Sequence, residues 1–213
     1  ILLAEQLCSE FLEIIDTSHT HVMHVHSGET HHYSNTKPVN IHVFANTARN
    51  MGENCIIFTS YHSLHRVMEA DIEVNTIYFD EAHNSVQRNF FPATEFFAND
   101  ADRCYFYTAT PKHSLTISKP GMNDAAVYGQ VLINVPAPEL VEQGYILPPK
   151  VVVKQLPLIK GRKVMYAEDA DNLLETIDDN NIDKTLICAR TTKQIMGLIS
   201  QSDFCVELAR RGY

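Results

Sequence analysis

The stretch TIYFDEAH, residues 76–83, joins a short apolar run to two adjacent carboxylates and a histidine. The run 76–79 has the length of a buried strand and is rich in β-branched and aromatic residues. In open parallel sheets, ligands bind at the carboxyl ends of strands, which is where Asp80 and Glu81 fall. Asp80 is suited to hold Mg²⁺ through water, and Glu81 to orient or deprotonate an attacking water. A solvated acidic turn is the alternative interpretation, and the pair alone does not decide between the two.

Three further apolar runs, at 22–25, 55–59 and 104–107, have the same strand-like length and composition. Helix-like segments lie among these runs, at 2–15, 63–70 and 92–98. The first of them places its apolar residues on one helical face. Strands that alternate with helices predict an α/β domain with a mostly parallel sheet.

The composition changes at residue 135. Five prolines follow within residues 135–157, at Pro136, Pro138, Pro148, Pro149 and Pro157. Because proline restricts both itself and the residue before it, we expect an extended connection here, with a short helix at 138–144. Beyond it, a helix at 168–180, a strand at 185–189 and a helix beginning near Thr191 predict the opening of a second α/β unit.

A second polar motif follows the run 104–107. Thr108-Ala109-Thr110-Pro111 places two hydroxyls at the tip of that predicted strand. If the strand neighbours 76–79, these hydroxyls can bond to His83 or to the two carboxylates. Taken alone, the motif is equally consistent with an ordinary passage from strand to loop.

Together, a strand ending in DEAH and, 25 residues after His83, a strand ending in TAT resemble motifs II and III of the superfamily 2 (DEAD/DEAH-box-like) helicases. The resemblance extends along almost the whole chain in the same order. ILLAEQ (1–6) resembles the end of motif Ia, and IFTSYHSL (57–64) resembles the segment before motif II. ELVEQGYILPP (139–149) resembles the passage between the two motor domains, and TLICAR (185–190) resembles motif IV.

The resemblance implies a parallel-sheet RecA-like motor domain of the P-loop NTPase type in residues 1–134, incomplete at its N-terminus. It implies a connector in 135–157 and the incomplete beginning of a second RecA-like domain in 158–213. The site residues that it implies are Asp80 for Mg²⁺, Glu81 as catalytic base, His83, Thr108 and Thr110 for coupling hydrolysis to movement, and Thr59, Ser60 and Tyr61 for approach to the nucleic-acid backbone. The last three hydroxyls have a simpler alternative role, which is to cap the following helix.

The implied activity is ATP hydrolysis, with Mg²⁺, coupled to unwinding of or movement along DNA, with RNA as the alternative track. The motor subunit of a restriction enzyme is a close variant. A departure from the family pattern is that no GxxxxGK[ST] phosphate loop occurs within the 213 residues. We expect that loop upstream of Ile1, and the arginine-finger motifs beyond Tyr213. A non-catalytic α/β fragment that binds nucleic acid or a protein partner is the competing interpretation.

Composition limits the remaining classes. Hydrophobic residues make up 45% of the chain, which is enough for a buried core, and the net charge of −9 argues against a protein that simply coats nucleic acid. No apolar run approaches the roughly 18 residues of a membrane span, and the N-terminal residues lack the pattern of a signal peptide. The five cysteines are scattered without a CxxC pair, which predicts reduced thiols and a cytoplasmic location.

Two other clusters have competing interpretations. Six histidines lie between positions 19 and 32: His19, His21, His24, His26, His31 and His32. Imidazole is a common metal ligand, but no cysteine or carboxylate pattern with structural-zinc spacing accompanies them, so we favour a strand with alternating faces. For Phe90, Phe91, Phe96 and Phe97 we favour a buried helix face over a base-stacking platform.

The missing phosphate loop gives the first prediction. Without its backbone N–H groups and lysine, most of the cradle for the ATP phosphates is absent. We therefore expect the 213-residue chain to show no nucleic-acid-stimulated ATPase activity in a phosphate-release assay. Turnover that disappears in Glu81→Gln would contradict this.

Overall fold

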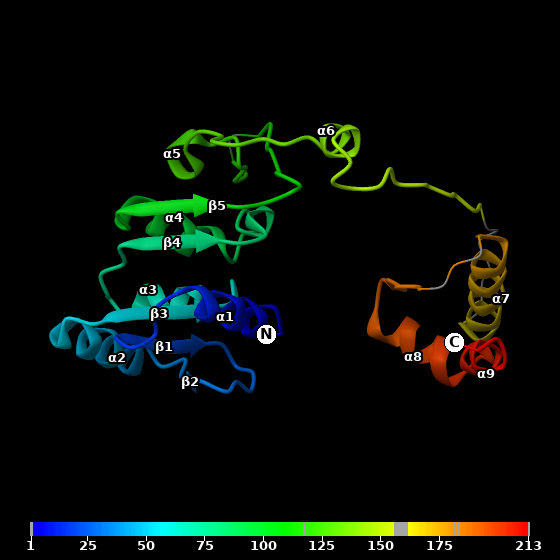
Figure 1. Ribbon diagram of the computed structural model, residues 1–213, viewed down its shortest axis with the longest axis horizontal. Coiled ribbons are helices and arrows are strands. Elements are labelled where there is room, and N and C mark those ends of the chain that lie inside the picture. Colours follow the sequence, from blue (N-terminus) through cyan, green and yellow to red (C-terminus); the bar gives the residue numbers. More distant parts are fainter. Residues whose placement is uncertain (1, 117, 156–161, 181, 183, 213) are drawn as a thin grey trace. The chain divides into compact units, whose positions relative to one another are not determined.

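The computed structural model describes residues 2–116, 118–155, 162–180, 182 and 184–212. The chain divides into two compact units, Ile1–Val135 (unit 1) and Pro136–Tyr213 (unit 2), each with a hydrophobic core of its own (Figure 1). Pro157, the last proline of the expected connector, and the residues 158–161 that follow it lie outside the described ranges. In the part of the chain that the structure describes, no helix combines the length and the apolar character needed to cross a membrane.

Parallel strands form the centre of unit 1. They are β1 (Thr20–Val25), β2 (Tyr33–Ser34), β3 (Asn54–Thr59), β4 (Thr76–Phe79) and β5 (Arg103–Phe106). The first three form one sheet in the order β2-β1-β3, and β4 pairs with β5 in a second sheet. Every pairing is parallel, so the predicted α/β class with parallel strands is confirmed. The two-residue β2 is too short to leave a pattern in the sequence.

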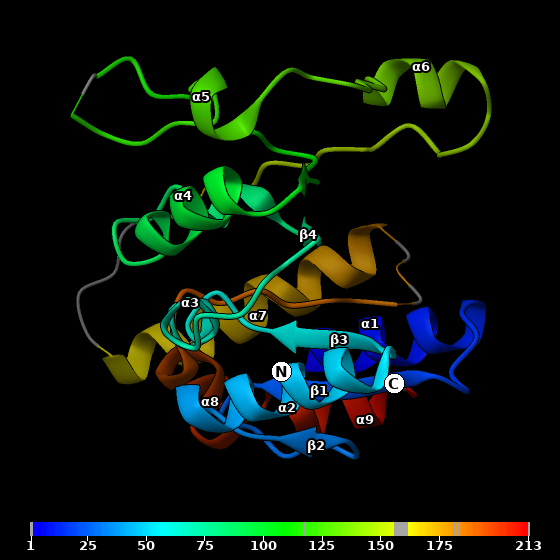
Figure 2. The same ribbon diagram turned by 90° about the vertical axis from the view of Figure 1, so that its left-hand side faces the viewer.

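Helices connect consecutive strands of unit 1 except β1 and β2, which are joined by residues 26–32 without a helix. The helices of unit 1 are α1 (Leu2–Ile14), α2 (Pro38–Met51), α3 (Leu64–Glu69), α4 (Phe91–Asp100) and α5 (Ala125–Tyr128). Helices α3 and α4 lie on one side of the strands and α1 on the other (Figures 1 and 2).

Helix α2 was not expected from the sequence. Its buried residues, Ile41 and Ala48, are two turns apart and make a sparse apolar face. Its ends do carry recognisable signals. Pro38 occupies the first turn, and Gly52, at φ 71°, closes the last turn by donating its N–H to the Arg49 carbonyl at 3.0 Å.

The core of unit 1 fixes the end of β4. Met23 from β1, Val67 from α3, and Phe97 from α4 are buried together with Phe79, the last residue of β4. Burial of an apolar side chain of this size contributes about 1.5–3 kcal/mol. Phe79 also stacks on Phe106 of β5, with ring centroids 4.9 Å apart. The residue immediately before Asp80 is therefore held from both sides.

The phenylalanines near α4 divide between core and surface. Phe90 and Phe97 are buried, as expected for a helix face that packs inward. Phe96 is 39% exposed and meets Phe97 edge-on. The face is thus largely a packing surface.

Helices make up the regular structure that is described in unit 2: α6 (Ala137–Glu142), α7 (Arg162–Asn180), α8 (Thr192–Ser200) and α9 (Phe204–Arg210). Thr191 caps α8, because its hydroxyl accepts the Gln194 N–H at 3.2 Å. The strand expected at 185–189 is wrong: these residues form no ladder, and Leu186 is 90% exposed. A strand requires a neighbour, and no other strand lies in the described part of this unit.

Helices α7 and α8 meet at Gly197. A Cβ built at this position overlaps the ring of Tyr166, which is itself buried. Elsewhere in a helix, Gly→Ala is stabilising by about 1 kcal/mol. Here we expect Gly197→Ala to lower the free energy of unfolding by about 1–3 kcal/mol, because the added methyl group overpacks the crossing.

Urea unfolding followed by circular dichroism measures this effect, with Tyr166→Leu as the second background. The Gly197→Ala penalty should shrink when the ring is gone. An equal penalty in both backgrounds would show that the overlap with Tyr166 is not its cause.

Candidate functional site

The pairing of β4 with β5 places the DEAH and TAT motifs side by side at the same edge of the sheet. Phe79 lies opposite Phe106 in the parallel register, so both strands end at the same height. Pairing continues past the strands: Tyr107 donates its N–H to the Phe79 carbonyl at 2.9 Å, and Ala82 donates its N–H to the Tyr107 carbonyl at 2.8 Å. The turn that carries the carboxylates is therefore hydrogen-bonded to the segment that leads into TAT.

Side chains from both motifs lie within hydrogen-bonding distance of one nitrogen, Nδ1 of His83. His83 lies in a single 3₁₀ turn (Ala82–Asn84), and its Nδ1 is 3.0 Å from Thr108 Oγ1 and 3.3 Å from Thr110 Oγ1. The same nitrogen is 3.2 Å from Glu81 Oε2. The Thr110 N–H donates to Thr108 Oγ1 at 3.1 Å, which fixes the loop around the imidazole. The structure thus brings together four of the residues that the sequence singled out.

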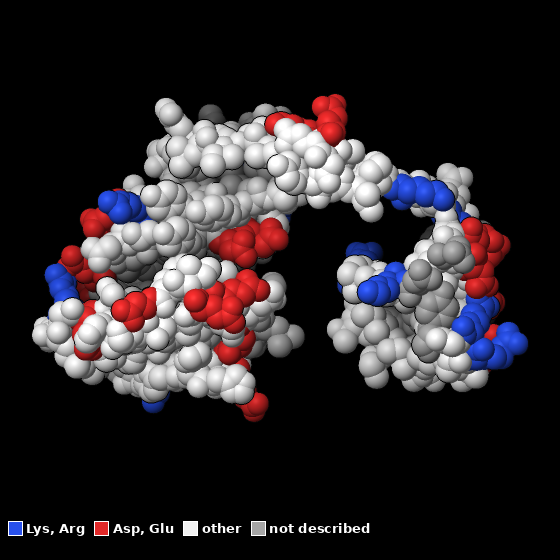
Figure 3. All heavy atoms as spheres, in the orientation of Figure 1, with Lys and Arg blue, Asp and Glu red and all other residues white. Residues whose placement is uncertain are grey.

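Glu81 has an unusual backbone. Its φ and ψ are both 47°, in the left-handed region that residues other than glycine rarely occupy. Asp80 supports this conformation, because its Oδ1 accepts the Glu81 N–H at 2.9 Å. Such strain costs about 1–3 kcal/mol and is concentrated at functional sites in proteins. Both carboxylates are exposed, and acidic atoms gather over the turn after β4 (Figure 3).

Tyr61 contacts the turn that contains Asp80 and Glu81. Its hydroxyl donates to the Asp80 carbonyl at 2.8 Å, and its ring stacks on Phe79 and Phe90. Burial, followed by the nearby Asp80 charge, raises the pKa of Tyr61, so its hydroxyl stays protonated. Both the ring and the hydroxyl of Tyr61 therefore make contacts within unit 1.

Thr59 and Ser60 also bond within unit 1. Thr59 Oγ1 donates to the Val25 carbonyl at 3.0 Å, which ties β3 to the end of β1. Ser60 Oγ lies 3.4 Å from Ser63 Oγ, at the start of α3. Ser63 occupies the N-cap position without a side-chain cap bond. These two hydroxyls therefore form hydrogen bonds within unit 1, close to the end of β3.

The charge of unit 1 is strongly one-sided. Residues 1–135 contain 7 Lys or Arg and 15 Asp or Glu. A phosphate backbone is repelled by such a balance unless cations intervene. The site at β4 and β5 is thus better suited to a metal cation than to a bare phosphate.

A second cluster combines histidines that the sequence singled out as possible metal ligands with two residues, Glu5 and Cys8, that it did not connect with them. Glu5 and Cys8, both in α1, lie beside the histidines of β1 and of the loop that follows it. Their distance along the chain, from Cys8 to His24, hides any metal-ligand spacing. The amphipathic pattern of 2–15 predicts that α1 packs against the sheet, but it does not indicate that Glu5 and Cys8 meet these histidines.

Comparison of the chain with protein-family models, curated proteins and solved structures found no match. Functional inference therefore depends on the residues and their geometry. The most informative geometry is the convergence of Glu81, Thr108 and Thr110 on His83.

The backbone of Glu81 gives a stability prediction. Glycine avoids the Cβ clash of the left-handed region, which costs other residues about 1–2 kcal/mol. We expect Glu81→Gly to be more stable than Glu81→Ala by about 1 kcal/mol in urea unfolding.

Glu95 provides a matched control, because it is an exposed glutamate inside α4. There the order should reverse, with Gly less stable than Ala by about 1 kcal/mol. The same order at both positions would mean that the Glu81 backbone is not strained.

Proposed function

We propose that this chain carries part of the catalytic centre of an ATP-dependent nucleic-acid helicase or translocase of the superfamily 2 kind, with unit 1 as a RecA-like motor domain. The observation that supports this most strongly is the contact of Glu81, Thr108 and Thr110 with His83 Nδ1. These are the residues that the resemblance to motifs II and III assigns to hydrolysis and coupling. An incidental acidic turn has no reason to share one imidazole with two threonines from the next strand.

The turn suits a hard cation. Its donors are carboxylate oxygens, Asp80 uses Oδ1 for the Glu81 N–H, and both side chains are open to solvent. We assign Asp80 to Mg²⁺, which would neutralise charge on the phosphates, and Glu81 to the water that attacks them. His83 Nδ1 restrains the Glu81 carboxylate at a distance of 3.2 Å.

The nucleotide needs more than these residues supply. The 213 residues contain no phosphate loop, so we propose that the phosphate cradle comes from outside this sequence. We also propose that the basic surface that binds the nucleic-acid phosphates comes from outside unit 1, because unit 1 is acidic. DNA is the proposed track and RNA the alternative, and a restriction-enzyme motor remains a close variant of the same function.

A non-catalytic binding role is the competing function. Such a role needs no phosphate loop, and none occurs within the 213 residues. The two functions differ in what Glu81 does. A binding module tolerates Glu81→Gln, whereas a hydrolase loses its base.

Hydrolysis and movement can be separated in a longer protein that contains this chain together with a phosphate loop. We expect Glu81→Gln to lower the rate of ATP hydrolysis by about 10²–10⁴-fold while nucleotide binding persists. We expect the double variant Thr108→Ala/Thr110→Ala to keep most hydrolysis but to lose strand displacement or translocation by roughly 10-fold or more, since coupling free energies are about 1–3 kcal/mol.

Both activities are measured in parallel and normalised to the folded fraction. Thr47→Ala is the control, because Thr47 is an exposed threonine whose hydroxyl bonds only within its own helix, to the Val43 carbonyl at 2.7 Å. Wild-type hydrolysis in Glu81→Gln would refute the catalytic assignment. Equal losses of both activities in the threonine variant would leave those residues as structural.

A further inference from the structure

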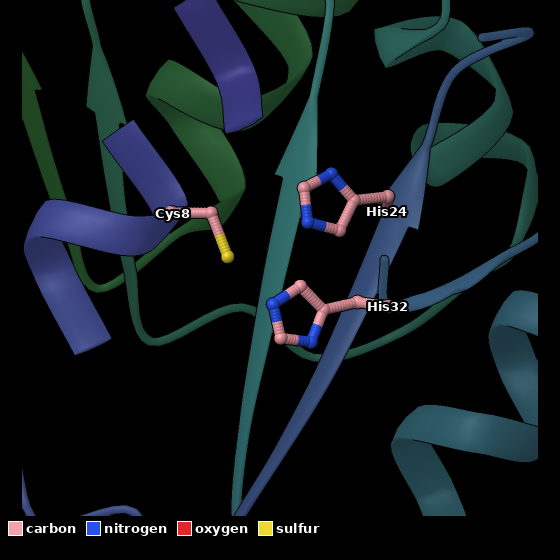
Figure 4. Close-up of side chains that lie close together, drawn as sticks. All are labelled: Cys8, His24 and His32. Atoms are coloured by element: carbon pink, nitrogen blue, oxygen red, sulfur yellow. The ribbon is translucent and has the colours of Figure 1, made fainter. Parts of the chain in front are cut away.

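A cluster of potential metal ligands lies on the side of β1 that faces α1. Cys8 comes from α1, His24 from β1, and His32 from the loop that precedes β2. One ligand atom from each lies within 4.8 Å of the others. Figure 4 shows the two imidazole rings and the Cys8 sulfur directed toward one another. Cys8 and His24 are buried, and His32 is accessible to solvent.

The rings are held in place before any ligand binds. The His24 ring stacks on Phe58 with ring centroids 5.4 Å apart, and it is nearly parallel to the His32 ring, with centroids 5.5 Å apart and an interplanar angle of 5°. The backbone N–H of His32 donates to Thr30 Oγ1 at 3.2 Å, which anchors the loop that carries the ring.

Two polar atoms in this cluster lack hydrogen-bond partners. Among the described residues, Glu5 Oε1 and His24 Nε2 are the buried side-chain oxygen and nitrogen atoms without one. Buried polar atoms are almost always satisfied, and exceptions commonly mark a site for water or an ion. It is notable that both exceptions in the described chain fall in one cluster, on neighbouring side chains.

The hydrogen bonds around His24 indicate which of its ring nitrogens is available to an ion. Gly28 donates its N–H to His26 Nδ1 at 3.2 Å, which leaves the proton of a neutral His26 on Nε2. That Nε2 is 3.1 Å from His24 Nδ1, so without an ion His24 keeps its own proton on Nε2, where no acceptor lies. With a cation on His24 Nε2, the proton moves to Nδ1. That nitrogen can no longer accept from His26 Nε2, 3.1 Å away, and a small rotation of the His24 ring would turn its N–H toward Glu5 Oε1, 3.5 Å from His24 Nδ1.

This arrangement matches the chemistry of zinc. A thiolate and two imidazoles are preferred zinc ligands, with bonds of about 2.0–2.3 Å, so small side-chain rotations would bring the three atoms to bonding positions. A ligating histidine characteristically donates its other N–H to a carboxylate, as Glu5 permits. The thiolate and the Glu5 carboxylate together offset the charge of a divalent ion.

We propose that Cys8, His24 and His32 bind Zn²⁺, that Glu5 positions His24, and that the fourth coordination position opens on the solvent side beside His32. The site is separate from the carboxylates that follow β4. Its ligands come from α1, β1 and the loop before β2, so the ion cross-links three consecutive segments of the chain. Zinc binding therefore holds α1 on the sheet.

The test uses the whole 213-residue chain with Zn²⁺ and with Co²⁺ as a spectroscopic probe. We expect one zinc per chain after dialysis, a thiolate-to-cobalt charge-transfer band, and a higher melting temperature with zinc. Cys8→Ser should abolish the charge-transfer band. His32→Ala should weaken zinc binding by at least about 10-fold, and Glu5→Gln by about 10–100-fold as expected for an outer-shell group.

Matched controls are Cys205→Ser, at an exposed cysteine of unit 2, and His19→Ala, at an exposed histidine of the same segment. Both should bind zinc as wild type does. Because His32 is accessible, its replacement leaves the core intact even if Cys8→Ser fails to fold. Absence of stoichiometric zinc, a cobalt complex without the thiolate band, or unchanged affinity in His32→Ala would each overturn the proposal.

Discussion

The in-register pairing of β4 with β5 is the interaction on which the candidate site depends. Phe79 and Phe106 stack across the pair and are packed into the core, so the two strands cannot slide without exposing an aromatic ring. A slip of one residue would also turn alternate side chains to the opposite face. This register places His83 beside Thr108 and Thr110. The geometry of the candidate site is thus set by apolar contacts in the core beneath it, together with the hydrogen bond from the Tyr61 hydroxyl to the Asp80 carbonyl.

Much of unit 1 could be predicted because its strands are short apolar runs bounded by polar residues. The ends of β4 and the convergence on His83 follow from strand length and parallel pairing alone. Helix α2 was missed because its inward face is sparse, and 185–189 was wrongly assigned because an apolar run becomes a strand only beside a partner. The roles of Tyr61 and Cys8 were not predictable. Each depends on contacts between segments whose spacing in sequence carries no periodic signal.

The two clusters in unit 1 show contrasting electrostatics. Asp80 and Glu81 are exposed carboxylates, where a cation is exchanged freely with water and other ligands. Cys8 and His24 are buried, where a cation would be retained and would contribute to folding. One domain would therefore use a transient ion for chemistry and a resident ion for structure. The proposed zinc site would stabilise the helix that precedes β1, whereas the proposed magnesium site would act only together with nucleotide.

The crossing of α7 and α8 has a consequence for sequence variation. Gly197 has no side chain because the Tyr166 ring fills that space, so the two positions share one volume. In related chains that retain this crossing, a larger residue at 197 is compatible only with a smaller one at 166. The pair should therefore covary, although the two residues belong to different helices and differ in chemistry. Such covariation would identify unit 2 in divergent sequences even where its helical patterns are too polar to recognise.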